Sequence, residues 1–266
     1  MMKPTKLIPL LAAALLHGGA ALAANPAIRV ILVGDSTMAT ASGYGDALCA
    51  RFTGDVACTN LARGGRSSKS FREEGRWDEV QRLLKDGAGF GASYVLVQFG
   101  HNDQPGKAPR STDLATEFPA NMARYASEAK ALGGIPVLVT PLTRRSFRHT
   151  PGGDYLKDDL APWAAATRAV AAREHVTLLD LNADSAAAVQ AMGQAEADTL
   201  AVAPPPPVVA TPADPTQVEP AGAAKSAFDR THVGAKGADF FAHMVERELV
   251  RARPELATYF KDGGRP

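Results

Sequence analysis

The sequence predicts an α/β sandwich built on a parallel β-sheet. Four short apolar runs are typical of strands buried on both faces, at residues 28–33, 94–99, 135–139 and 176–181, and residues 56–61 form a weaker fifth candidate. Between these runs, apolar residues recur every three or four positions, which is the spacing of one helix face. Strands that alternate with helices indicate βαβ units and therefore a parallel sheet.

The helical spacing is clearest in three stretches. Trp77, Val80 and Leu84 predict one helix. A longer stripe predicts a second, and consists of Leu114, Phe118, Met122, Tyr125, Ala129 and Leu132. A third stripe lies near the end of the chain, and consists of Phe241, Val245 and Leu249. We interpret all three stripes as core rather than as contacts to a cofactor.

Length and composition favour one soluble domain. The chain has 266 residues, with 45% apolar and 21% charged side chains, which are ordinary values for a globular protein. The 29 Lys and Arg residues balance 28 Asp and Glu residues, for a formal charge of +1. No dense basic run is present, so the composition argues against a nucleic-acid partner.

The first 23 residues resemble a secretory signal peptide. Lys3 and Lys6 precede an apolar run at residues 7–16, which is too short to span a bilayer. Ala21 and Ala23 supply the small-x-small pattern read by signal peptidase, so we expect cleavage after Ala23 or close to it. We therefore expect residues 24–266 to form a single domain that is secreted or periplasmic and has no membrane anchor.

Cys49 and Cys58 are the only cysteines, and they lie in a chain expected to enter an oxidising compartment. We interpret them as a disulfide, and the alternative is two buried free thiols. Neither cysteine has a His or Cys neighbour at metal-ligand spacing, so no zinc site is expected.

Residues 183–224 break the alternating pattern, because they are rich in Ala, Pro, Asp and Thr. Residues 186–200 could form a helix, whereas the proline content of residues 202–221 favours an extended, mobile loop. Such a long loop is unusual in a compact domain. It is either an insertion near the active site or a disordered segment, and we favour disorder.

Ser36 follows directly after the first predicted strand. A serine there stands at the rim where parallel sheets bind ligands, and this position suits a nucleophile. A helix that began soon afterwards would also direct its N-terminal amides toward the same place. The alternative is that Ser36 only caps that helix.

A serine nucleophile needs a base, and His232 is the best candidate. Asp229 lies three residues earlier, so one turn can bring its carboxylate to the imidazole Nδ1. The carboxylate would then fix the tautomer and leave Nε2 free to accept the serine proton. The alternative is that Asp229 begins a turn and His232 caps the last helix.

Acyl transfer also needs donors for an oxyanion. Three candidates follow predicted strands: the backbone amides of Ser36 and Gly65, and the side-chain amide of Asn102. A glycine at position 65 permits a conformation that directs its N–H into a cleft. Because the strands are parallel, one edge of the sheet would gather these groups.

These four segments together resemble the SGNH hydrolases, also called the GDSL-like esterases. The matching blocks are residues 34–36, Gly65, residues 100–103 and residues 229–232, in the family's order. The details are most similar to the rhamnogalacturonan acetylesterase branch. That similarity rests on residues 34–39, 62–68, 98–103 and 140–145 and on the Asp-x-Thr-His block.

The resemblance implies a flavodoxin-like, three-layer α/β/α sandwich with a five-stranded parallel sheet. It implies Ser36 as nucleophile, Asp229 and His232 as the remaining triad residues, and an oxyanion hole of Ser36, Gly65 and Asn102. It implies no metal or organic cofactor. The Ala/Pro-rich segment before Asp229 is the departure from the family pattern, and it leaves the shape of the substrate cleft open.

Cationic residues suggest which substrate the site binds. We expect Arg144, Arg145 and Arg148 to meet a uronate carboxylate, because guanidinium groups bind carboxylates in a bidentate fork, and we add His101 as a further substrate contact. The alternative is three solvated loop charges. The other loops near the predicted site are also polar, which favours a sugar over a lipid; they contain Ser67, Ser68, Lys69, Gln104, Lys107 and Arg110.

The sequence therefore predicts a monomeric, secreted carbohydrate esterase that removes O-acetyl groups from a pectic polysaccharide such as rhamnogalacturonan. The alternatives within enzymes are an acetylxylan esterase, a lipase or a thioesterase with the same triad, because fold and triad do not determine the substrate. A non-catalytic extracellular carbohydrate-binding protein is the alternative from another class.

Overall fold

The fold is a five-stranded parallel sheet between two layers of helices. We describe it from a computed structural model that covers Met1, residues 27–203 and residues 228–264. The strand order is β2-β1-β3-β4-β7, and every neighbouring pair is parallel. In sheet order the strands are β2 (Val56–Asn60), β1 (Ile28–Gly34), β3 (Ala92–Gln98), β4 (Ile135–Val139) and β7 (Thr177–Leu179). The predicted fold class is confirmed.

The central strands are apolar on both faces because each face supports its own core. In β1, Val30 and Leu32 pack with the core on one side of the sheet, whereas Ile31 and Val33 pack with the core on the other. This division follows from the period of two residues along a strand. A central strand therefore reads as a continuous apolar run.

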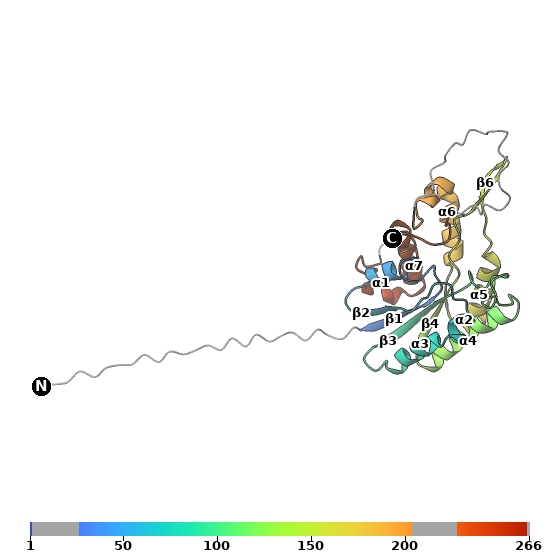
Figure 1. Ribbon diagram of the computed structural model, residues 1–266. Helices are drawn as coiled ribbons and strands as arrows, with labels where there is room; N and C mark the ends of the chain where they lie inside the picture. Colours follow the sequence, from blue (N-terminus) through green and yellow to red (C-terminus); the bar gives the residue numbers. More distant parts are fainter. Residues whose placement is uncertain (2–26, 204–227, 265–266) are drawn as a thin grey trace.

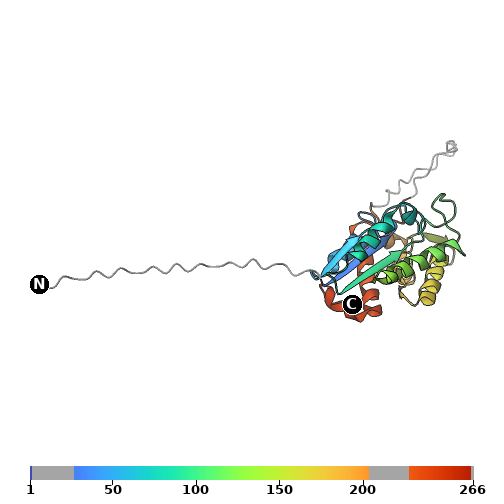
Figure 2. The ribbon, with the colours of Figure 1, turned by 90° about the horizontal axis from the view of Figure 1, so that it is seen from below.

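The helices form two layers, and the sheet lies between them (Figure 1). On one side lie α1 (Gly45–Arg51), α6 (Leu181–Asp198) and α7 (Ala235–Ala252). On the other side lie α2 (Ser70–Glu73), α3 (Arg76–Lys85), α4 (Glu117–Ala131) and α5 (Ala161–Glu174). Figure 2 shows α7 and α4 on opposite sides of the sheet. The chain closes with the 3₁₀ helix η1 (Pro254–Tyr259).

The strand order creates a switch point between β1 and β3. From β1 the chain moves outward to β2 and then crosses back to β3 on the far side of β1. In this register Gly34 at the end of β1 pairs with Gln98 at the end of β3. Ligands of open α/β sheets bind outside the carboxyl ends of strands at such a point.

Several elements differ from the sequence prediction. A two-stranded antiparallel hairpin, β5 (Phe147–Thr150) and β6 (Gly153–Leu156), was not predicted, and neither were α1 and α2. Strand β7 is shorter than the predicted run at residues 176–181, because α6 already begins at Leu181.

The structure describes only the first part of the Ala/Pro-rich segment, residues 183–203. Residues 183–198 belong to α6, whose Leu181 and Val189 are buried in the core beside α7. The predicted helix at residues 186–200 is therefore confirmed, with an earlier start. The loop expected at residues 202–221 lies mostly outside the described residues, as does the expected signal peptide at residues 1–23.

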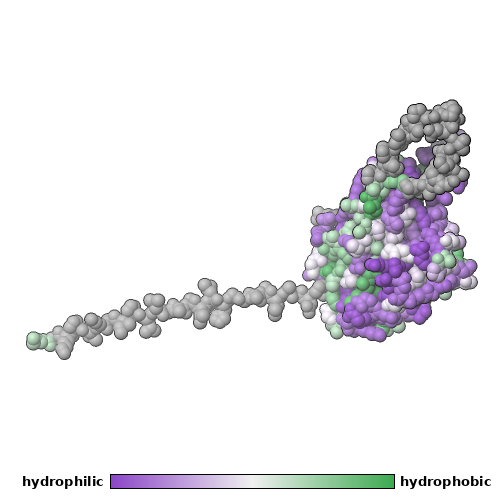
Figure 3. All heavy atoms as spheres, viewed as in Figure 1, coloured by the Kyte–Doolittle hydropathy of each residue, from purple (hydrophilic) through white to green (hydrophobic). Residues whose placement is uncertain are grey.

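The surface in the view of Figure 3 is mainly hydrophilic, with smaller hydrophobic areas. Within residues 27–203 and 228–264, only Tyr155 and Val202 are large apolar side chains that are exposed. None of the described helices is long and apolar enough to span a membrane.

Cys49 on α1 and Cys58 on β2 form a disulfide, with their Cα atoms 5.4 Å apart. The predicted pairing is confirmed. The bridge ties the first helix to the edge strand of the sheet, and α1 in turn packs against α7.

Replacing both cysteines, as Cys49→Ser with Cys58→Ser, should lower the free energy of unfolding by about 2–3 kcal/mol, because the bridge closes a short loop in the unfolded chain. Urea unfolding of wild type and the double variant would measure the difference. Wild type treated with a reductant should show a similar loss. Equal stability of oxidised and double-variant proteins would contradict this expectation.

Candidate active site

Ser36 lies in a tight turn that leaves the end of β1. The backbone amides of Met38 and Ala39 donate to the carbonyl of Asp35, at 3.2 and 3.0 Å. The next helix, α1, begins only at Gly45, with Tyr44 as its N-cap residue. Ser36 therefore caps no helix, and its residue exposure is 9%.

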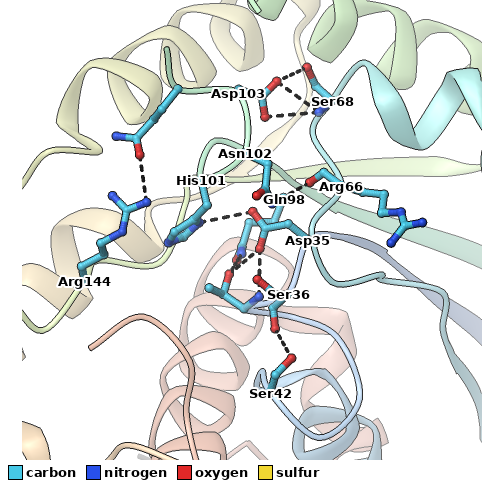
Figure 4. A network of polar contacts seen from close by, with 12 residues as sticks. Asp35, Ser36, Ser42, Arg66, Ser68, Gln98, His101, Asn102, Asp103 and Arg144 are labelled. Atoms are coloured by element: carbon cyan, nitrogen blue, oxygen red, sulfur yellow. Dashed lines mark hydrogen bonds and ion pairs between the residues drawn. The ribbon is translucent and has the colours of Figure 1, made fainter. Parts of the chain in front are cut away.

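A buried polar network supports this turn (Figure 4). Asp35 is fully buried; its Oδ1 accepts hydrogen bonds from the amide and hydroxyl of Thr37, and its Oδ2 pairs with His101 Nδ1 at 3.2 Å. Gln98 donates to the Thr37 hydroxyl and accepts from the Tyr44 hydroxyl, both at 2.7 Å. These bonds fix the backbone that presents Ser36.

The same contacts determine the ionisation of Asp35. Burial alone would raise its pKa, but the charge and hydrogen bond of His101 and the hydrogen bonds from Thr37 hold that pKa below its usual value. The folded protein therefore carries an ionised carboxylate directly beneath the turn.

Asp229 and His232 lie in the segment before α7, in the arrangement expected from their spacing. Asp229 Oδ2 is 2.8 Å from His232 Nδ1, and Asp229 Oδ1 accepts from the backbone amides of Thr231 and His232. Partial burial opposes ionisation of Asp229, but these hydrogen bonds and the charge of His232 hold its pKa below the usual value. The carboxylate orients the imidazole and leaves Nε2 on the other side of the ring.

Ser42 connects this segment to the Ser36 turn. Its hydroxyl donates to the carbonyl of Ser36 at 2.7 Å, and its carbonyl accepts from the amide of Val233 at 3.0 Å. In the described part of the chain, no hydrogen bond joins Ser36 Oγ directly to His232. Such contacts are often long in ligand-free enzymes and tighten only when substrate binds.

Gly65 and Asn102 lie on the two loops that follow β2 and β3. Gly65 has φ +79°, a conformation that favours glycine. A Cβ placed on its neighbour Gly64 would lie 3.7 Å from the Cβ of Ser36, so this loop runs beside the serine. Asn102 Nδ2 donates to the carbonyl of Arg66 at 3.0 Å, and its second N–H remains for another acceptor.

Asp103 clamps these two loops together. Its buried carboxylate accepts hydrogen bonds from the amide and hydroxyl of Ser68 and from the hydroxyl of Thr112. Burial raises the pKa of Asp103 to about 6, although these hydrogen bonds act in the opposite direction. Figure 4 shows Asp103 joined to Ser68, so the clamp ties the loop of residues 64–68 to the loop that carries Asn102.

Comparison with known proteins identifies the family. A profile of the GDSL-like Lipase/Acylhydrolase family matches residues 32–240, which is well over half of the chain. The chain is an SGNH hydrolase of this family. The match includes the end of β1, the loops that carry Ser36, Gly65 and Asn102, and the segment of Asp229 and His232.

Curated relatives of this SGNH hydrolase include two proteins from Bacillus subtilis. Rhamnogalacturonan acetylesterase RhgT is 33% identical over 182 residues, which are 66% of this chain and 74% of that protein. The probable rhamnogalacturonan acetylesterase YesY is 32% identical over 160 residues, which are 58% of this chain and 70% of that protein. The chain therefore belongs to the rhamnogalacturonan acetylesterase-like branch, and it is an acetylesterase.

Solved structures share the fold. Bacillus subtilis YxiM superposes with a TM-score of 0.61 at 24% identity, over 84% of this chain and 56% of that chain. Axe2, an acetylxylan esterase from Geobacillus stearothermophilus, superposes with a TM-score of 0.56 at 15% identity, over 86% of this chain and 96% of that chain. At these identities the likeness concerns the fold alone.

The expectation that Arg145 binds substrate is wrong. Its side chain is fully buried and donates to three backbone carbonyls, those of Asp229, Thr231 and His232. Burial lowers its pKa to about 10, which keeps the guanidinium charged at neutral pH. Arg145 therefore holds the backbone of residues 229–232 in place.

The other three expected substrate contacts have different positions. His101 is 2% exposed and faces Asp35, so the structure does not place it in contact with substrate. Arg144 is bound by Asp159 at 2.6 Å and by Gln104 at 2.8 Å. Arg148 lies on the β5–β6 hairpin, where it lines a separate cavity of about 400 Å³.

Sequence reasoning missed the support that α6 gives to this site. Asp198 binds the guanidinium of Arg230 through both oxygens, at 2.9 and 3.0 Å. Gln194 donates to Asp198 and to the carbonyl of Arg145. No motif marks these residues, because the arginines that they support, Arg145 and Arg230, lie 49 and 32 positions away in the sequence. The helical composition of residues 186–200 was the only signal.

Replacing Arg145 with Met should lower kcat/KM for p-nitrophenyl acetate by about tenfold or more. Three carbonyls of residues 229–232 would lose their donor, and the segment that carries His232 would shift. Initial rates and far-UV circular dichroism would measure activity and folding. Arg148→Met, on the hairpin, is the matched control and should retain activity. A folded Arg145→Met variant with wild-type kcat/KM would contradict the supporting role.

Asp103 should make stability fall as the pH rises from about 4 to 6. The unfolded carboxyl ionises near its ordinary pKa of 3.8, whereas the folded one keeps its proton to about 6, so the folded state binds more protons in this window. The slope is at most about 1.4 kcal/mol per pH unit. Urea unfolding at several pH values would give the free energies of unfolding of wild type and Asp103→Asn. The difference between the two free energies should change with pH in this window and be constant above it. A difference that does not depend on pH would contradict the raised pKa of Asp103.

Proposed function

We propose that this acetylesterase removes O-acetyl groups from an acidic pectic polysaccharide of the rhamnogalacturonan class, with Ser36 as its nucleophile. The observation that carries the proposal is the 2.8 Å pair of Asp229 and His232, which Ser42 links to the Ser36 turn. The names of the relatives RhgT and YesY supply the substrate class.

In the proposed first half-reaction, His232 Nε2 accepts the proton of the Ser36 hydroxyl as Oγ attacks the acetyl carbonyl. Asp229 holds the imidazole through Nδ1 and stabilises the imidazolium that forms. The depressed pKa of Asp229 supports this role, because an ionised carboxylate is required. The imidazolium then returns its proton to the sugar oxygen, which leaves as an alcohol and produces the acetyl-enzyme.

The negative charge on the tetrahedral oxygen needs preorganised donors. We assign this role to the backbone amides of Ser36 and Gly65 and to the free N–H of Asn102 Nδ2. Asp103 supports the assignment by holding the two loops together. In the second half-reaction, His232 deprotonates a water molecule that attacks the acetyl-enzyme, and acetate leaves as Ser36 regains its proton.

A polar substrate suits the loops better than a lipid does. The loop after β3 carries Gln104, Lys107 and Arg110, and few large apolar side chains are exposed among the described residues. A uronate-containing polysaccharide would match the positive charges of this loop.

We further propose that the protein acts as a monomer and that it acts outside the cytoplasm. Residues 1–23 predict the export, and the Cys49–Cys58 disulfide supports it.

Acetate release from a panel of substrates tests the proposal, and the panel comprises acetylated rhamnogalacturonan, acetylated xylan and p-nitrophenyl acetate. Wild type should release acetate fastest from rhamnogalacturonan. Ser36→Ala should lose nearly all turnover on every substrate, because the nucleophile is gone. Asn102→Ala should lower kcat by about 10²–10³, the usual loss of one oxyanion donor.

Each assignment can fail separately. Faster release from xylan than from rhamnogalacturonan would overturn the pectic substrate but leave the acetylesterase intact. Wild-type turnover by a folded Ser36→Ala variant would overturn the nucleophile. Covalent labelling of Ser36 by an organophosphonate, detected by mass spectrometry, gives an independent readout of its reactivity.

A further inference from the structure

A cavity of about 480 Å³ lies directly beside the proposed oxyanion hole. Gly65 forms part of its wall, together with Arg66 and Arg110, and Glu73 and Glu74 at the end of α2 also line it. A ligand in this cavity would therefore lie next to the reacting ester.

Most of the charges around this cavity are already paired. Arg66 Nε contacts both carboxylate oxygens of Glu74, at 3.1 and 2.9 Å, and Arg76 binds the same carboxylate at 2.7 Å. Glu73 adds one negative charge on the α2 wall. Arg110 differs from Arg66, because no carboxylate in residues 27–203 or 228–264 lies within ion-pair distance of it.

One edge of the Arg110 guanidinium is already engaged. Its Nη1 donates to the carbonyl of Gly65 at 3.0 Å and contacts Asn102 Oδ1 at 3.4 Å. A Cβ on Gly65 would lie only 3.2 Å from this Nη1, so the guanidinium packs closely against the glycine. These contacts fix the orientation of the group.

The other edge of the guanidinium is available for a ligand. Arg110 Nε and Nη2 make no hydrogen bond to any described residue, and neither nitrogen is sealed from solvent. Two parallel N–H groups of this kind match the two oxygens of a carboxylate in a bidentate pair. Arg110 therefore presents a pair of oriented N–H donors whose geometry fits a carboxylate.

Neighbouring cations strengthen the positive potential here. Burial lowers the pKa of Lys107, and the nearby charges of Arg144 and Arg110 lower it further. Lys107 Nζ donates to the carbonyl of His101, and it has no carboxylate partner among the described residues. Arg144 is neutralised by Asp159. The loop at residues 104–112 thus carries two cations without a counter-ion.

We propose that Arg110 binds the carboxylate of a uronate residue in the substrate through its Nε and Nη2, and that the cavity beside Gly65 is the subsite for this sugar. The proposal rests on the proposed function, because it names the group that the esterase would recognise. Since the same guanidinium contacts Gly65 and Asn102, a uronate bound there lies beside the oxyanion donors.

Two forms of one substrate test the subsite: acetylated rhamnogalacturonan fragments with free uronates, and the same fragments with methyl-esterified uronates. Wild type should have a lower KM for the free acid. Arg110→Gln should raise that KM by about tenfold or more, the usual effect of losing a charge-assisted pair. It should abolish the preference for the free acid, whereas the KM for the methyl ester should change little.

A purely structural role of Arg110 predicts a different result. Gly65 and Asn102 would then lose support, and kcat would fall by the same factor on both substrates while the preference remained. That outcome would overturn the proposal. Arg110→Lys keeps the charge but not the fork, so it should retain only part of the preference. It provides a second readout if Arg110→Gln does not fold.

Two further arginines serve as controls. Arg82→Gln removes a largely exposed charge on α3, where it pairs with Glu79, and should leave both KM values unchanged. Arg148→Gln removes a charge from the hairpin cavity. Loss of the preference in Arg148→Gln, together with its retention in Arg110→Gln, would place the uronate on the hairpin and overturn the proposal.

Failure of the proposed function has its own signature. Wild type would then deacetylate p-nitrophenyl acetate or xylan but show no preference for free uronate. A preference in wild type that survives in folded Arg110→Gln would overturn the subsite alone.

Glu73→Gln should change the KM in the opposite direction. It removes from the cavity wall a negative charge that repels the uronate, so the KM for the free acid should fall.

Discussion

The parallel pairing of β1 with β3 is the constraint on which the site depends. It ends with Gly34 opposite Gln98, so the loops that carry Ser36 and Asn102 leave the sheet side by side. The segment after β2 joins the same edge, because the amide of Arg63 donates to the carbonyl of Gly34 at 2.9 Å. Backbone hydrogen bonds alone therefore bring three distant segments together, before any catalytic side chain is considered.

Three buried charges then fix the loops that the sheet brings together. Asp35, Asp103 and Arg145 are each buried, and each is surrounded by several hydrogen-bond partners rather than by solvent. The two carboxylates show how the surroundings decide ionisation: the pKa of Asp35, beside His101, is lowered, whereas that of Asp103 is raised to about 6. A buried charge costs free energy, but one with several partners defines a single loop geometry.

Local sequence signals predicted what depends on local structure. The apolar runs identified the strands, and the spacing of Asp229 and His232 predicted their contact, because three residues are one turn. The substrate arginines could not be predicted in the same way. Arg144, Arg145 and Arg148 are close in sequence, but their side chains reach Asp159, the carbonyls of residues 229–232 and the hairpin cavity, respectively. Side-chain direction and long-range partners decide these roles, and neither is visible in a run of cations.

The partners of each arginine separate structural from binding roles. Arg145 directs its two Nη groups at three carbonyls, and Arg144 meets a carboxylate of the same chain, so both guanidinium groups already have partners within the folded protein. In Arg110, Nη1 contacts Gly65 and Asn102, whereas Nε and Nη2 on the opposite edge make no hydrogen bond to a described residue. A guanidinium that is both orientated and incompletely paired has lost much of its conformational entropy before binding, so a carboxylate gains more from meeting it than from meeting a free surface arginine. Under the function proposed above, an anchor of this kind beside Gly65 and Asn102 would use the charge of a flexible polysaccharide to position its acetyl group at Ser36.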